Sequence, residues 1–180
     1  MEKKYNIYQM ANIGLMAAVI CILGPLSIPI GVVPISFTNL AIYIVLYALG
    51  MKKGSVSYII YMLIGFVGLP VFSNFSSGPS KLLGPTGGYI IGFFFMALIA
   101  GFFIDKYFTK WYLCIVGMVL GTAVCYVFGT LWLSYQAHLA ASKAFEVGVI
   151  PFILGDLAKI LIASIIGPQI RKRLIKANLI

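Results

Sequence analysis

Long apolar runs with very few charges constrain this chain more than any other feature. Of its 180 residues, 62% are hydrophobic and only 9% are charged, whereas about 25% of the residues in a soluble domain are charged. The chain therefore has too few polar side chains to cover a surface that faces water. We predict an all-α integral membrane protein whose residues 1–180 form a single domain.

Six of the runs are long enough for a membrane-spanning helix, which needs about 20 mostly apolar residues. Proline, glycine and lysine residues separate them, and these residues end apolar helices or interrupt their pattern. The sequence therefore predicts a bundle of six transmembrane helices, at residues 8–26, 35–51, 55–72, 88–104, 111–135 and 147–166.

The basic residues predict the orientation of this bundle. With a cytoplasmic N-terminus, only Lys81 and Lys143 fall on outer segments, and the inner segments hold Lys3, Lys4, Lys52, Lys53, Lys106, Lys110, Arg171, Lys172, Arg173 and Lys176. This distribution follows the positive-inside rule and predicts that both termini are cytoplasmic. In a soluble protein, a net charge of +9 would suggest a nucleic-acid partner. Because the basic residues lie between apolar runs, we expect contact with the lipid bilayer and none with nucleic acid.

Two charges lie inside the last apolar run. Asp156 and Lys159 each cost about 2.5–3.5 kcal/mol if they sit near the centre of a spanning helix. Being three residues apart, they share one helix face, which must point into the bundle or a polar cavity. One interpretation is an internal ion pair that fixes helix packing. The other is a ligand site, and it is favoured because apolar residues often replace a purely structural pair without loss of stability.

The outer segment 72–86 is longer than a turn between neighbouring helices requires, which indicates a lid or a binding loop rather than a merely flexible connection. Its polar groups and those just after it are candidate ligand contacts, and nearby aromatic rings are candidate apolar walls. The candidates are Asn74, Thr86 and Tyr89 for the first role, and Phe75 and Trp132 for the second.

Small residues in the first run form a smooth helix face. Ala11, Gly14 and Ala18 are spaced so that another helix can approach closely. This face either packs inside the bundle or docks another membrane subunit.

Several chemistries have no matching motif. The sequence contains no G-x-x-x-x-G-K-[ST] loop for ATP phosphates, and no Ser-His-Asp or paired-carboxylate arrangement can be proposed. The lone His138 and the three cysteines, which lie in apolar runs without a C-x-x-C spacing, suggest no metal site. We therefore expect neither an enzyme nor a bound metal.

Three stretches resemble the BioY family. They read Gly-Leu-Pro-Val-Phe at 68–72, Leu-Gly-Pro-Thr-Gly-Gly-Tyr-Ile-Ile-Gly at 83–92, and Pro151-Phe152 followed by Gly155-Asp156-x-x-Lys159. Members of this family are the biotin-binding S components of energy-coupling factor (ECF) transporters. The resemblance implies six helices and an outward-facing biotin pocket, with Asp156 and Lys159 as its acidic and basic residues.

The resemblance also implies partners and a location. It places the chain in the plasma membrane of a prokaryote, beside a transmembrane coupling subunit and two cytoplasmic ATPases, with biotin as transported ligand and no cofactor. The chain departs from the family at 34–39, where it reads Pro-Ile-Ser-Phe-Thr-Asn and members often read Pro-Ile-Thr-Leu-Gln. Two alternatives stay open, namely an S component for another vitamin and a proton-coupled secondary transporter that uses Asp156 as its relay.

Overall fold

The computed structural model describes residues 7–30 and 32–177, and most of them are helical. The long helices are α1 (Ile7–Leu23), α2 (Thr38–Val67), α4 (Gly87–Lys106), α5 (Trp111–Gln136) and α7 (Ile150–Lys176). The short elements are β1 (Ser27–Ile28), β2 (Ile35–Ser36), the 3₁₀ turn η1 (Ser73–Phe75), α3 (Pro79–Leu83) and α6 (Ala141–Gly148).

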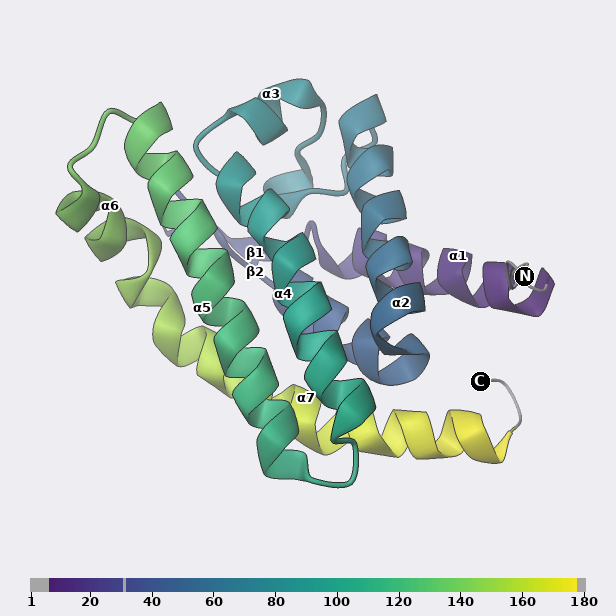
Figure 1. The fold of residues 1–180 in the computed structure, drawn as a ribbon. Coiled ribbons are helices and arrows are strands. Elements are labelled where there is room, and N and C mark those ends of the chain that lie inside the picture. Colours follow the sequence, from purple (N-terminus) through teal and green to yellow (C-terminus); the bar gives the residue numbers. More distant parts are fainter. Residues whose placement is uncertain (1–6, 31, 178–180) are drawn as a thin grey trace, which may run out of the picture.

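The long helices pack as a bundle. Figure 1 shows α4 beside α5, with α2 on the other side of α4 and α7 crossing at an angle. The helix α1 packs against α2, and α7 contacts both α2 and α5. Many large apolar side chains on the outside of α5 and α7 are exposed, for example Leu131 and Leu154. Helices that are apolar on their outer face as well as on their inner face suit a bundle in lipid.

Three helices of the described chain are long and apolar enough to cross a membrane, namely α4, α5 and α7, and α1 is a shorter apolar helix of 17 residues. They correspond to the runs predicted at 88–104, 111–135 and 147–166, although α7 continues to Lys176. The chain is thus a helical membrane protein. The count of six spans and the cytoplasmic termini stay predictions, and Lys3 and Lys4 lie outside the described residues.

The second and third predicted helices are joined. The sequence predicts them at 35–51 and 55–72, but α2 runs through Thr38–Val67 and is interrupted only at Gly50, with φ 77° and ψ 178°. The Asp105 carboxylate accepts a hydrogen bond from the Met51 backbone N–H at 2.7 Å and one from Arg171 at 2.9 Å. Asp105 thereby caps the second part of α2 and ties the break to α4 and α7.

The connections contain more structure than the sequence indicates. After α1, the chain forms a short antiparallel pair in which β1 residue Ser27 faces Ser36 of β2. Pro25 and Pro34 flank this pair, and because proline lacks a backbone N–H and fixes φ, neither residue suits a helix interior. The predicted outer loop includes η1 and α3, and a further short helix, α6, precedes α7.

The break in α2 gives a stability prediction. Gly50→Ala should lower the stability of the purified protein by about 1–3 kcal/mol, because this backbone conformation is essentially restricted to glycine and an added Cβ would meet the Asp105 carboxylate. A thermal unfolding curve in detergent measures this effect. Gly14→Ala is the control, since a Cβ there meets nothing within 4 Å, and it should be neutral or slightly stabilising. Equal melting temperatures for both variants would contradict the proposed role of Gly50.

Candidate functional site

A cavity lies where the start of α2, the second part of α2, α4, α5 and α7 converge. It contains about 690 Å³ of space not filled by protein atoms, including the part open to solvent. Its lining includes the polar residues Ser36 of β2, Thr38 and Asn39 of α2, Ser73 of η1, Thr86 just before α4, Thr122 of α5, and Asp156 and Lys159 of α7.

The two intramembrane charges meet in the wall of this cavity. Asp156 and Lys159 are both buried, and the ammonium lies 3.0 Å from the carboxylate. The carboxylate also accepts hydrogen bonds from the Asn39 side-chain amide at 2.9 Å and from the Tyr126 hydroxyl at 2.6 Å. The structure shows the internal ion pair, and it places both residues in the lining of the cavity. Their role in binding a ligand stays a prediction.

Neither charge is saturated by its protein partners among the described residues. Lys159 donates to Asp156 and to the Ser36 backbone carbonyl at 2.7 Å, and an ammonium has three N–H donors. Asp156 accepts three hydrogen bonds, and an ionised carboxylate offers about four lone-pair sites. Each group can therefore form at least one more hydrogen bond, with a ligand in the cavity.

Aromatic rings supply most of the apolar wall. The rings of Tyr61 and Phe72 meet edge to face with centroids 5.6 Å apart, and Tyr58 lies 5.6 Å from Tyr61. The remaining aromatic residues of the lining are Tyr89, Phe93, Tyr126 and Phe152. Such a site suits a ligand with an apolar ring body and a few polar groups.

Two residues of the predicted outer site line the cavity, and their positions follow from helix packing. Thr86 and Tyr89 are both buried, at the start of α4. The Tyr89 hydroxyl donates to the Gly148 carbonyl at 2.9 Å, so it braces α6. The preceding Gly88 lets α4 approach α5, because an added Cβ would meet Trp132 and the Phe128 carbonyl. The glycines of this motif thus serve helix packing.

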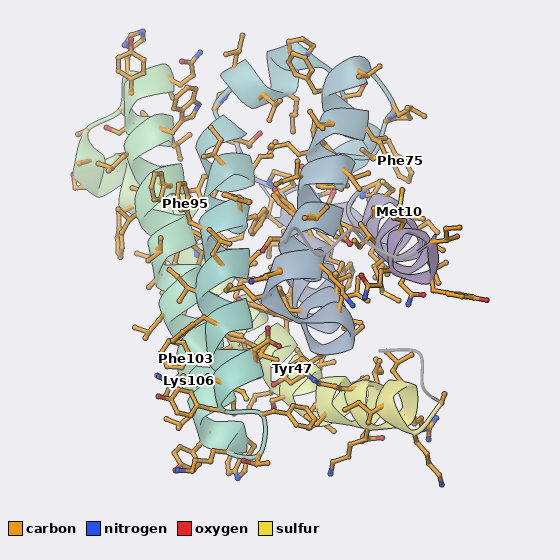
Figure 2. The ribbon with its side chains drawn as sticks, turned by 45° about the vertical axis from the view of Figure 1, so that its right-hand side comes forward. Met10, Tyr47, Phe75, Phe95, Phe103 and Lys106 are labelled. Atoms are coloured by element: carbon orange, nitrogen blue, oxygen red, sulfur yellow. The ribbon has the colours of Figure 1, made fainter. Side chains whose placement is uncertain are left out.

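The other three predicted residues lie outside the cavity lining. Asn74 accepts a hydrogen bond from the Ser27 hydroxyl at 2.7 Å, and its backbone N–H donates back to that oxygen at 2.8 Å. Trp132 donates to the Gly84 carbonyl at 2.9 Å. Phe75 is 65% exposed and lies at the edge of the molecule (Figure 2). Asn74 and Trp132 hold the outer segment in place, which explains why their polar groups do not face the cavity.

Sequence reasoning missed two partners of Asp156, namely Asn39 and Tyr126. Asn39 is a polar residue in the first turn of α2, and its place within an apolar run was a usable signal. Tyr126 gave no such signal, because the chain has eleven tyrosines and many lie in apolar runs. Only the packing of α5 against α7 brings its hydroxyl to the carboxylate.

The small residues of α1 form an open face. Ala11, Gly14 and Ala18 are exposed, whereas the opposite side of the helix, with Ile13 and Ala17, is buried. They therefore do not pack inside the bundle. Within the described residues, no group of three His, Cys, Asp or Glu side chains lies close enough to hold a metal ion.

Comparison with known proteins decides the family. The family model described as "BioY family" matches residues 1–176. This chain belongs to the BioY family. Relatives of this BioY chain include the biotin transporter BioY of Thermotoga maritima, with 36% identity over 91% of this chain and 96% of the relative. Another is the biotin transporter BioY2 of Lactococcus lactis, with 32% identity over 96% of this chain and 95% of the relative.

A solved structure extends the agreement to three dimensions. The S component for biotin from an ECF-type ABC transporter superposes with a TM-score of 0.85 at 30% identity, covering 96% of this BioY-family chain and 95% of the other. The resemblance that the sequence motifs indicated is thereby confirmed, for the family and for the fold.

The buried ion pair gives a second stability prediction. Lys159→Met should destabilise the protein by about 3–5 kcal/mol, because it leaves the Asp156 carboxylate buried without its cation. The double variant Asp156→Asn/Lys159→Met should recover most of this loss. Thermal unfolding in detergent measures both.

The matched control is Lys143→Met. Lys143 pairs with Glu146 at 2.9 Å and the same i,i+3 spacing, but these side chains are 55% and 59% exposed, and exposed pairs contribute about 0–1 kcal/mol. If Lys159→Met lowers the stability of the protein no more than Lys143→Met does, the buried pair does not stabilise the fold.

Proposed function

We propose that this protein is the biotin-binding S component of an ECF-type vitamin importer. The observation that carries the proposal is the buried Asp156–Lys159 pair, which retains hydrogen-bonding capacity on an aromatic-lined cavity. Relatives named as biotin transporters and a superposable S component for biotin support the same ligand.

The chemistry of biotin matches this site. Its valerate carboxylate needs a cation or N–H donors, its ureido group carries two N–H donors and one carbonyl, and its bicyclic ring is largely apolar. In our proposal the free donor of Lys159 meets the carboxylate, Asp156 accepts a ureido N–H, and Tyr61 and Phe72 contact the rings. Thr86 and Tyr89 complete the wall. The reverse orientation of the ligand would use the same two charged residues.

Transport requires partners in this proposal. We infer that the chain captures biotin at the outer face of the plasma membrane of a prokaryote, and that a transmembrane coupling subunit and two cytoplasmic ATPases drive its delivery. The exposed small residues Ala11, Gly14 and Ala18 are the proposed docking face for the coupling subunit, because small side chains let helices approach closely in lipid.

Biotin affinity tests the two charged residues. Asp156→Asn and Lys159→Met should each weaken binding of labelled biotin by about 2–5 kcal/mol, which is a Kd increased roughly 30-fold or more. Lys143→Met and Asn74→Ala should change the Kd far less, because neither residue lines the cavity. Parental affinity in Lys159→Met would remove Lys159 from the proposed site.

The identity of the ligand is tested separately. Mass spectrometry of the protein, purified without added vitamin from cells grown in rich medium, should detect bound biotin in the parent and much less in Asp156→Asn. Competition with unlabelled biotin, thiamine and riboflavin gives the specificity. Displacement of labelled biotin by thiamine or riboflavin at equal concentration would contradict biotin specificity.

A further inference from the structure

We propose that a groove between α5 and α7 binds one acyl chain of a membrane phospholipid, and that this chain supports the wall of the ligand cavity from its outer side. The groove contains about 390 Å³ of space not filled by protein atoms, including the part that is open to the surroundings. Its apolar lining consists of Val119 and Ala123 on α5 and Ile153, Leu157 and Ile160 on α7.

The shape of the groove suits a thin chain. Its lining runs from Val119 to Tyr126 on α5 and from Ile153 to Ile160 on α7, which is about 10 Å along each helix at a rise of 1.5 Å per residue. It lies between two of the candidate membrane spans. Three of its own lining side chains, Val119, Ile153 and Leu157, are 39%, 42% and 45% exposed, so the groove opens on a surface that meets hydrocarbon.

Water is a poor occupant of this groove. A buried water needs two to four polar partners. Among the polar residues that line the groove, Thr122 and Tyr126 are already engaged, and the one remaining acceptor site of Asp156 is too few. The Thr122 hydroxyl donates to the Met118 carbonyl at 2.8 Å, and the Tyr126 hydroxyl donates to Asp156 at 2.6 Å. An apolar occupant forms no hydrogen bonds, so it does not need the hydroxyl groups of Thr122 and Tyr126 to be free.

A partner helix fits less well than an acyl chain. Helices that associate in lipid favour small residues at the contact, because these let the two backbones approach. Here only Ala123 among the apolar lining residues is small, and the others are valine, isoleucine and leucine, so the lining lacks the small residues that a helix contact favours. A flexible chain of methylene groups can pass between these larger side chains.

The groove and the ligand cavity share three residues, namely Thr122, Tyr126 and Asp156. An acyl chain behind the Tyr126 ring would limit its movement and keep its hydroxyl on the Asp156 carboxylate. This second step rests on the proposed function, because it makes biotin binding depend on lipid occupancy. By linkage, bound biotin would strengthen lipid binding by the same factor.

Photolabelling tests the lipid site without any ligand. The full chain is placed in nanodiscs that contain a phospholipid with a diazirine in the middle of one acyl chain, and the labelled peptides are mapped by mass spectrometry. Segments 119–126 and 153–160 should be labelled in the parent, and Ala123→Phe, which fills the groove, should reduce this labelling several-fold. Ala123→Leu is a milder filling variant in case the phenylalanine impairs folding.

Ala158→Phe is the matched control, since Ala158 is an exposed alanine of α7 that does not line the groove. It should leave the labelling of both segments unchanged. Equal labelling in the parent and both Ala123 variants would overturn the lipid site. A crosslink to a second protein chain, or labelling by a diazirine fatty acid but not by the phospholipid, would also overturn it.

Biotin dissociation tests the coupling. Dissociation from the parent should become several-fold faster when lipid is replaced by a detergent with a rigid ring system, while Ala123→Phe should dissociate at the same rate in both environments. An equal change in the two proteins would overturn the coupling. A parent that binds no biotin in either environment refutes the proposed function, and the photolabelling result still decides whether the groove binds lipid.

Discussion

The hydrogen bonds to the Asp156 carboxylate connect three parts of the bundle. Asn39 reaches it from α2, Tyr126 from α5 and Lys159 from α7. A buried anion is stable only while its partners stay in place, because removing one leaves uncompensated charge in a medium of low dielectric constant. The cavity exists where these three helices meet, so the same interactions that hold the helices together also shape the site.

The irregular segments around the cavity are held by their own hydrogen bonds. The Ser36 carbonyl accepts a hydrogen bond from Lys159, and the Asn74 side chain accepts one from Ser27. The Trp132 ring N–H donates a hydrogen bond to the Gly84 carbonyl. Backbone and side-chain polar groups near a membrane need such partners. These hydrogen bonds fix the irregular segments that form part of the wall of the cavity.

Much of this molecule is predictable from composition and position along the chain. The scarcity of charge requires a lipid-facing surface, and the apolar runs locate α4, α5 and α7. A charge inside such a run is costly wherever it points, so Asp156 and Lys159 stand out before any fold is known. The sequence motifs around them also indicate the BioY family correctly.

Tertiary structure alone decided which other groups reach these charges. Helical periodicity shows which residues of one helix share a face, but it contains no information about which face of another helix lies opposite. Tyr126 therefore could not be distinguished from the other tyrosines, and Asn74, Phe75 and Trp132 were expected at a cavity that they do not line. The joining of two predicted helices at Gly50 also depends on tertiary structure. The carboxylate that caps the second part of α2 belongs to Asp105, which is distant in sequence and adjacent only in the folded bundle.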